Sequence, residues 1–506
     1  MVYLLVIIVS IIIAARFPIT NDEAYYIAFA RDLQLSYVDA PPFVAYLNVI
    51  QVKLGLNQPI FARLFVIILH LISILLLMSI VKNNCNKNPD LSSRLLLTFL
   101  LGYLVPIFGL YGIFVLPDAG LILGLSIMLY AADKITRNQV IGIVDLLLLG
   151  LGLGIGALSK YHILPLGGGI LFGLLFHLSK PKFKINNLIK LLISTLIGLV
   201  IALPVFVWNY NNHYASFVFQ LQHGFSSNKW QIISLISFIG GAMLYLTPWF
   251  AWLLLKKGLF ANLRGYIVIP FISLLFILLI SSLRKNVLPH WISPGFWLLI
   301  PYAVIATKDL KFLKIMCKYT SIIWCILLFI LLLPQGLSNI KYLSKKFNPD
   351  TSGLADLFLW QELPQFVVNN LQLQQSLTNM QQTDKTKCVA AEPVIGTARW
   401  HWASQLEFHH VFPKITKVLN LDPNSSSFYL WRDDWSKYAN CPILYMGNNS
   451  FVDLQKLALL ITIENSYVIY GIGDYKSINL LIINGVLKDK ATLSKFQTNL
   501  INNPKY

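Results

Sequence analysis

Long apolar runs constrain the fold of this 506-residue chain more than any other feature. A helix needs about 20 apolar residues to cross the roughly 30 Å hydrocarbon core of a bilayer. About eleven runs approach this length, so we expect an α-helical polytopic membrane protein. No basic segment precedes the first run, which we therefore expect to be a retained span. The runs lie near residues 2–18, 60–81, 95–115, 118–133, 140–158, 162–178, 188–208, 231–255, 265–283, 290–306 and 317–335.

Charge is scarce and unevenly distributed. Charged residues make up 12% of the chain, against about a quarter in soluble proteins. The net charge of +18 gathers in alternate loops, as expected for loops that face the cytoplasm. This pattern places the N-terminus inside and requires no nucleic-acid partner. The expected cytoplasmic basic residues are Lys82, Lys87, Arg94, Lys134, Arg137, Lys180, Lys182, Lys184, Lys190, Lys256, Lys257, Arg264, Lys308, Lys311, Lys314 and Lys318.

The composition changes near residue 335, where polar clusters and short β-prone runs replace the apolar runs. We expect a transmembrane domain over 1–335 and one soluble α/β domain over 336–506, outside the cytoplasm. Cys388 and Cys441 fall in the second domain and can pair in an oxidising compartment, although the sequence leaves this pairing open. Within the spans, the glycines of residues 150–156 indicate close helix packing and not a phosphate loop.

The first predicted external loop, 19–59, contains an unusual density of acids. Thr20 and Glu23 fit a capping box, which predicts a helix beginning there. The helix must end before Pro41, because a residue that precedes proline is biased away from helical dihedrals. We therefore expect two short helices joined by a rigid corner. On the first helix, Asp22, Tyr25, Tyr26 and Phe29 recur at helical spacing.

Other external loops carry groups suited to a phosphate-bearing substrate. Asp118 lies in a short PDAG turn, and Lys160 and Tyr161 lie in SKYH. Arg284 and His290 belong to LRKNVLPHW. A carboxylate at the interface can act as a general base or orient an acceptor, and basic side chains can neutralise a phosphate leaving group.

Each of these residues also has a purely structural explanation. Glu23 can serve only as the capping partner of Thr20, and Asp118 can be a first-turn acid that begins a span. Lys160 and Arg284 can be basic side chains that reach for the interface from span ends. The paired histidines at 409–410 have no third ligand at metal spacing, so we expect no metal there.

Taken together, the motifs resemble those of bacterial glycosyltransferases that use polyprenyl-phosphate sugars. These enzymes are related to the dolichyl-phosphate-mannose protein mannosyltransferases, have the GT-C superfold and include the aminoarabinose transferase of lipid A. The resemblance covers most of residues 1–300, and TARWHWASQLEFHH at 397–410 resembles a C-terminal periplasmic segment more loosely. The matching segments are NDEAYYIAFARDLQLSYVDAPPFVAYL, FARL at 61–64, PDAG at 117–120, LSKYH at 158–162, and residues 204–225 and 286–297.

The resemblance implies an inverting sugar transfer at the periplasmic face of the bacterial inner membrane. The donor would be a polyprenyl-phosphate sugar, whose chain cannot leave the bilayer without losing about 0.8 kcal/mol per buried methylene. A divalent metal is a candidate cofactor. The implied catalytic acids are Asp22, Glu23 and Asp118, and the implied phosphate contacts are Arg63, Lys160, Tyr161, Arg284 and His290.

The expected acceptor is lipid A or another envelope glycolipid, and a protein hydroxyl is the alternative. Ala40 stands where related enzymes carry Lys or His before the two prolines, which leaves the acceptor class open. A lipid or solute transporter would place ionisable residues deep in several spans. Here the charges lie mostly at span ends, with Asp145 as the clearest exception. An assembly factor whose C-terminal domain only binds a partner would leave the ordered external motifs unexplained.

Overall fold

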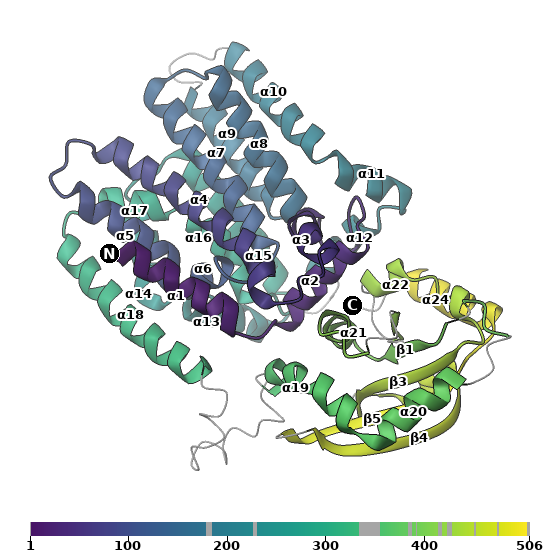
Figure 1. Ribbon diagram of the computed structural model, residues 1–506. Coiled ribbons are helices and arrows are strands. Elements are labelled where there is room, and N and C mark those ends of the chain that lie inside the picture. Colours follow the sequence, from purple (N-terminus) through teal and green to yellow (C-terminus); the bar gives the residue numbers. More distant parts are fainter. Residues whose placement is uncertain are drawn as a thin grey trace. The chain divides into compact units, whose positions relative to one another are not determined.

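The computed structural model divides into two compact units (Figure 1). The helical unit contains residues 1–16, 34–48 and 60–329, and the mixed unit contains 17–33, 49–59 and 330–506. The predicted domain boundary at 335/336 lies outside the described residues. The predicted external loop is thus divided between the two units. The structure describes residues 2–178, 185–225, 230–332, 355–382, 387–390, 392–412, 417–421, 428–449, 452–472 and 475–502.

In its described residues, the helical unit contains helices and connecting loops but no β-strand. Its first half contains α1 (Val2–Arg16), α3 (Phe43–Lys53, shared with the mixed unit), α4 (Pro59–Cys85), α5 (Leu91–Leu104), α6 (Pro106–Tyr111), α7 (Asp118–Asn138), α8 (Ile143–Ser159) and α9 (Ile163–Leu178). Its second half contains α10 (Ile185–Ile201), α11 (Leu203–Asn211), α12 (Ala215–Phe225), α13 (Ile232–Leu246), α14 (Pro248–Leu253), the π-helix η1 (Leu254–Leu259), α15 (Gly265–Ser282), the 3-10 helix η2 (Pro289–Ile292), α16 (Ser293–Trp297), α17 (Ile300–Ala306) and α18 (Leu310–Leu332).

Length and apolarity select three helices in the described chain that could each cross a membrane, namely α4, α7 and α15. The number rises to six if three interrupted pairs each form one span. These pairs are α1 with α2 (Asn21–Arg31), α10 with α11, and α13 with residues 248–259. The expected total of about eleven spans stays a prediction.

Prolines explain why several predicted runs are not continuous helices. Pro106, Pro204 and Pro248 each lie in the first turn of a new helix, where the missing N–H is harmless but continuation of the preceding helix is blocked. The predicted runs 95–115, 188–208 and 231–255 are therefore interrupted. The bends measure 55° between α10 and α11 and 93° after α13.

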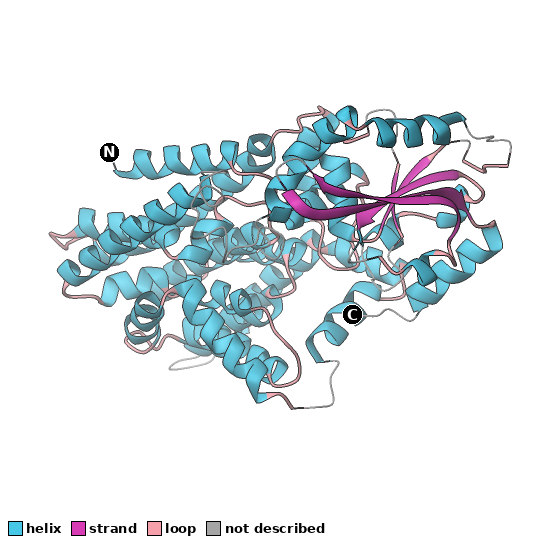
Figure 2. Ribbon diagram, turned by 90° about the horizontal axis from the view of Figure 1, so that it is seen from below, coloured by secondary structure: helices cyan, strands magenta, loops and turns pink. Residues whose placement is uncertain are grey.

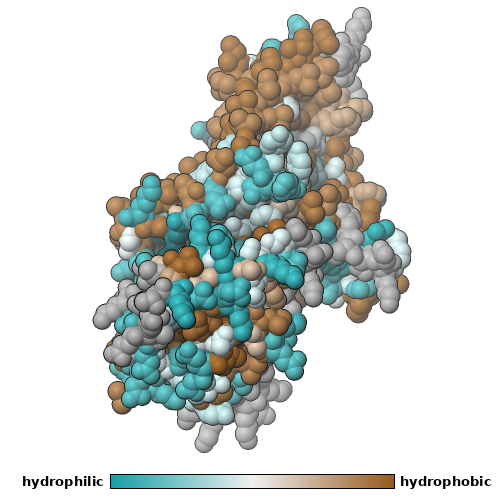
Figure 3. Space-filling model, turned by 90° about the vertical axis from the view of Figure 1, so that its right-hand side faces the viewer, coloured by the Kyte–Doolittle hydropathy of each residue, from teal (hydrophilic) through white to brown (hydrophobic). Residues whose placement is uncertain are grey.

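Glycines allow the central helices to approach closely. A Cβ at Gly124 of α7 would lie 2.4 Å from the Gly152 carbonyl oxygen of α8, and a Cβ at Gly152 would lie 2.5 Å from the Gly124 oxygen. A Cβ at Gly150 would lie 2.7 Å from the Ile197 side chain of α10. The predicted packing role of the 150–156 glycines is thereby confirmed. Hydrophobic residues also gather on part of the surface (Figure 3). The exposed apolar side chains of α10 are among the large hydrophobic residues on the surface, and they include Ile185, Ile189, Leu192, Leu196, Leu199 and Val200.

The mixed unit combines one five-stranded sheet with helices (Figure 2). Its strands are β1 (Val394–Thr397), β2 (Val418–Asn420), β3 (Pro442–Asn448), β4 (Ile461–Ile472) and β5 (Tyr475–Leu487), in the order β2-β1-β3-β5-β4. β1 pairs in parallel with β2 and β3, whereas β5 pairs antiparallel with β3 and β4. The helices are α2, α19 (Ala355–Asn369), α20 (Leu371–Gln382), α21 (Trp400–Phe408), α22 (Phe428–Arg432), η3 (Trp435–Tyr438), α23 (Leu454–Leu457) and α24 (Lys490–Asn502).

The core of the mixed unit lies on this sheet. Ile443 and Ile483, on neighbouring strands, pack with Trp435, and each of the three side chains is at most 1% exposed. A disulfide joins Cys388 to Cys441, the residue before β3. The pairing that the sequence left open is therefore present in the structure.

Candidate functional site

The α2 helix begins as the sequence predicts. Thr20 donates from its backbone nitrogen and its hydroxyl to Glu23 Oε2, at 3.0 and 3.1 Å, and Glu23 N donates to Thr20 Oγ1 at 3.3 Å. This reciprocal capping box is confirmed. Glu23 is completely buried, whereas Asp22 beside it is exposed. The structure thus shows the capping role of Glu23, whose catalytic role stays a prediction, and leaves Asp22 exposed.

Aromatic residues of the mixed unit surround α2. The Tyr25 ring lies 4.7 Å from that of Trp400 on α21, and Phe29 lies 4.7 Å from Phe428 on α22. The backbone nitrogen of Phe428 donates to the Tyr25 hydroxyl at 2.8 Å. The motif at 397–410 therefore supports the helix that carries Asp22, a pairing that local sequence patterns do not reveal.

Asp118 and Lys160 form a partly buried ion pair in the helical unit. Asp118 is the first residue of α7, and Lys160 directly follows α8. Lys160 Nζ lies 2.9 Å from both carboxylate oxygens of Asp118, whose side chain is 5% exposed. Lys160 therefore has a specific carboxylate partner, which the span-end interpretation does not predict.

Further polar groups converge on this ion pair. Tyr111 donates to the His290 carbonyl at 3.2 Å and lies close enough to Asp118 to interact with it electrostatically. His162 and His290 lie close enough to interact electrostatically with Asp118. The structure therefore brings together three predicted site residues, Asp118, Lys160 and His290. It adds Tyr111, which the sequence analysis missed because its hydrogen-bond partner His290 lies far away in the chain.

Tyr161 contacts a different set of polar residues. Its hydroxyl forms a short hydrogen bond with Ser216 of α12 and also interacts with Asn209 of α11. Asn209 Oδ1 in turn accepts from the Ser216 backbone nitrogen at 3.2 Å. Ser216 and Asn209 fall within the matching segment 204–225, which was the available signal for them.

The two predicted arginines occupy other positions in the helical unit. Arg63 is completely buried in α4, donates to the Ala14 carbonyl at 3.1 Å and lies over the Phe114 ring at 4.9 Å. Arg284 lies over the Trp230 ring at 5.6 Å. Within the described chain no ion pair joins Arg284 to Asp118. Their predicted contacts with phosphate stay predictions.

Asp145 is not the deep intramembrane acid that the sequence suggested. It lies in the first turn of α8, where its Oδ2 accepts from Gly142 N at 3.1 Å and its Oδ1 pairs with Lys134 at 2.8 Å. In the described helical unit, Asp133 of α7 is completely buried and pairs with Arg137 at 2.9 Å and Arg264 at 3.4 Å. Asp145 was misjudged because the predicted run 140–158 begins before its helix does.

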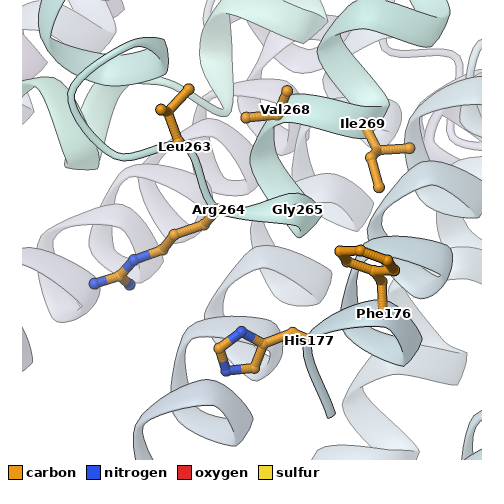
Figure 4. A pocket seen from close by; sticks show the side chains of 7 residues that line it. All are labelled: Phe176, His177, Leu263, Arg264, Gly265, Val268 and Ile269. Carbon is orange, nitrogen blue, oxygen red and sulfur yellow. The ribbon is translucent and has the colours of Figure 1, made fainter. Parts of the chain in front are cut away.

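A cavity of about 370 Å³ lies between the end of α9 and the start of α15 (Figure 4). Its wall includes Arg264, the partner of Asp133. Fifteen residues separate Asp133 from Asp118, which corresponds to about 22 Å along α7. This cavity is therefore not the candidate site. The lining residues are Phe176, His177, Leu263, Arg264, Gly265, Val268 and Ile269.

Among the described residues, no group of three or more His, Cys, Asp or Glu side chains is arranged to hold a metal ion. Asp22 and Glu23 belong to the mixed unit, whereas Asp118, Lys160, Tyr161 and His290 belong to the helical unit. The candidate site residues thus form two groups, each built by its own unit.

Known proteins share both sequence and fold with this chain. The family model described as dolichyl-phosphate-mannose-protein mannosyltransferase matches residues 39–208. Two crystal structures of ArnT from Cupriavidus metallidurans have a similar fold. The apo structure has a TM-score of 0.60 at 13% identity over 98% of both chains. The structure with undecaprenyl phosphate has a TM-score of 0.58 at 14% identity, over 96% of this chain and 97% of the other. The chain therefore shares its fold with these two structures.

A protein whose name states its acceptor matches part of the chain. Lipid A galacturonosyltransferase RgtD of Rhizobium johnstonii is 28% identical over 189 residues. The match spans 37% of this chain and 38% of the relative. The family resemblance predicted from the motifs is confirmed. The family model includes Asp118, Lys160 and Tyr161 but begins after Asp22.

Proposed function

We propose that this chain is an inner-membrane glycosyltransferase that moves a sugar from a polyprenyl-phosphate donor to lipid A or a related envelope glycolipid. The partly buried Asp118–Lys160 pair carries the proposal, because it holds a cation among polar groups at the end of a candidate membrane helix. Two relatives support it by name, one as a lipid A galacturonosyltransferase and one by its bound undecaprenyl phosphate.

Lys160 is suited to stabilising a departing phosphate. An ammonium group has three N–H donors, and the two oxygens of Asp118 account for two of them. The third remains for an anionic ligand. As the bond between the anomeric carbon and the phosphate oxygen breaks, negative charge develops on that oxygen, and a fixed cation stabilises this charge in the transition state. Asp118 would keep the ammonium group in place.

Asp22 is the proposed partner of the acceptor. In an inverting transfer the acceptor oxygen forms a new bond to the anomeric carbon as the polyprenyl phosphate leaves. If the acceptor is a hydroxyl, its proton would pass to the exposed Asp22 carboxylate. If it is a lipid phosphate, which is already anionic at neutral pH, Asp22 would orient the acceptor without removing a proton.

The proposed reaction takes place at the periplasmic face, with the mixed unit on that side. The uneven distribution of basic residues supports this orientation. We propose Arg63, Tyr161, Arg284 and His290 as further contacts of the donor phosphate. We also propose that a divalent metal takes part in the transfer. Transfer assays with and without a chelator test this.

A protein acceptor is the second candidate, because the matching family model is described as a protein mannosyltransferase. The two candidates differ in which product disappears from a deletion strain. We expect mass spectrometry to find a lipid A species without one sugar and unchanged periplasmic glycoproteins, with restoration by the intact gene. Unchanged lipid A together with altered glycoproteins would exclude the preferred acceptor. If the purified chain moves the intact donor across the membrane of vesicles and does not transfer the sugar, it is a transporter.

A further inference from the structure

A buried amide in the mixed unit contacts the helix that carries Asp22. Gln405 lies on α21 and is completely buried. Its Nε2 donates to the Ile19 carbonyl oxygen at 3.1 Å and to Asn21 Oδ1 at 3.0 Å. These acceptors lie on either side of the N-cap residue Thr20. The amide thus binds the chain at the point where α2 begins.

The chemistry of these contacts fixes the orientation of Gln405. The Ile19 carbonyl can only accept a hydrogen bond, so the amide nitrogen of Gln405 must face it. Both N–H groups of the amide are then used, one for the backbone and one for the Asn21 side chain. Two bonds from one planar group restrict rotation as well as translation of the bound segment.

The capping box transmits this restraint to Asp22. Thr20 is bonded to Glu23, and Ala24 N donates to the Thr20 carbonyl at 3.0 Å. Asp22 lies within this closed turn, directly after Asn21. Since α2 is an 11-residue helix, its first turn sets where the Asp22 carboxylate points.

We infer that Gln405 is a positioning residue that fixes the Asp22 carboxylate for transfer. The inference rests on the proposed function, in which Asp22 meets the acceptor. A displacement of about 1 Å can lower a rate by about 100-fold when reacting groups must be aligned. Gln405 therefore governs the chemical step, while donor binding depends on residues of the helical unit.

The test uses Gln405→Met, which keeps the length of the side chain but removes both donors. We expect kcat to fall about 10- to 100-fold, with KM for the donor changed less than about threefold. Asn21→Ala should lower kcat in the same direction, and the double variant should lose less than the product of the two separate effects, because the same hydrogen bond is removed. Multiplicative losses would contradict coupling through that bond.

Gln497→Met is the matched control. Gln497 lies on α24 in the same unit, is 8% exposed, and donates from Nε2 to the carbonyls of Leu430 and Asp433. Its loss should destabilise the mixed unit without changing kcat by more than about twofold. An equal fall in kcat for both glutamine variants would show general destabilisation and overturn the inference.

Hydrogen exchange separates this inference from the proposed function. In the full chain in detergent, Gln405→Met should accelerate exchange of the Glu23 and Ala24 amides, whereas Gln497→Met should not. Unchanged exchange in Gln405→Met would overturn the positioning role whether or not the protein transfers sugar. Accelerated exchange in a chain whose wild type transfers no sugar would support the restraint on α2 and reject the glycosyltransferase activity.

Discussion

Adjacent acids at the start of α2 have different environments, and this difference separates their expected roles. Asp22 is exposed, whereas Glu23 is buried and bonded to Thr20. We expect Asp22→Asn to lower transfer by about 10²- to 10⁴-fold, the usual range for loss of a general base, while membrane insertion is retained. Glu23→Gln should instead cost about 1 kcal/mol of stability through the weakened cap.

Transfer rates and thermal unfolding of the two variants check this prediction. Both side chains keep their shape, so each variant is a steric control for the other. Full activity of Asp22→Asn would remove the central catalytic assignment. A loss of transfer in Glu23→Gln without a loss of stability would assign chemistry to Glu23 as well.

The Asp118–Lys160 pair allows structure and catalysis to be separated. Lys160→Met leaves the buried Asp118 without its cation, which typically costs about 3–5 kcal/mol. Adding Asp118→Asn removes the uncompensated charge, so the double variant should recover much of that stability. Sugar transfer should remain absent in both variants, because no cation meets the phosphate. Denaturation midpoints and transfer assays measure the two effects, and a fully active double variant would refute the role of Lys160.

At the scale of elements, the α7–α8 contact depends on glycine. A Cβ at Gly124 would meet backbone atoms of α8 within 2.4 Å, and backbone cannot move aside as a side chain can. Gly124→Ala should destabilise the helical unit by about 1–3 kcal/mol through overpacking. Gly168 of α9 is the matched control, because nothing lies within 4 Å of its Cβ position.

Thermal unfolding in detergent compares the two alanine variants. Gly168→Ala should be neutral or slightly stabilising, since alanine favours a helix by up to about 1 kcal/mol over glycine. Equal destabilisation in both variants would mean that the α7–α8 contact is not the cause.

Sequence patterns predicted the helices and caps better than their partners. The capping box of α2 follows from Thr20 and Glu23 alone, because the interacting groups are three residues apart. Pro106 begins a new helix, α6. The end of the preceding helix was missed in the sequence because the apolar run continues across this proline. By contrast, the contact of Gln405 with Ile19 spans 386 positions. Such pairings depend on tertiary packing and leave no local periodicity.

At the scale of the whole molecule, the mixed unit should respond to acid. Burial, with a smaller contribution from Arg399, lowers the pKa of His401 to about 4. Burial, with a smaller contribution from His410, lowers the pKa of His409 to about 4. Unfolded histidines titrate near 6.5. Between these values the unfolded chain binds more protons than the folded chain, so stability should decrease as pH falls from 6.5 toward 4.

Urea midpoints of the full chain in detergent at pH 7, 5.5 and 4.5 test this dependence. The double variant His401→Gln, His409→Gln removes both titrating groups and should show a flatter profile over the same range. Identical profiles for the wild type and the double variant would assign the acid sensitivity to other groups.

The Cys388–Cys441 bond can serve as a chemical record of where the mixed unit folded. Cytosolic reductants keep thiols reduced, whereas the periplasm oxidises them to disulfides. Mass spectrometry of the intact chain, alkylated without reduction, therefore indicates the compartment in which the mixed unit folded. If the mixed unit is translocated, Cys388 and Cys441 should stay unmodified by the alkylating agent. If the unit stays in the cytoplasm, each of the two cysteines should carry one alkyl group. Three further cysteines, Cys85, Cys317 and Cys325, must be included in the count once the chain is denatured. Cys85 and Cys317 are buried free thiols. One covalent bond thus reports the sidedness of the whole protein without any introduced label.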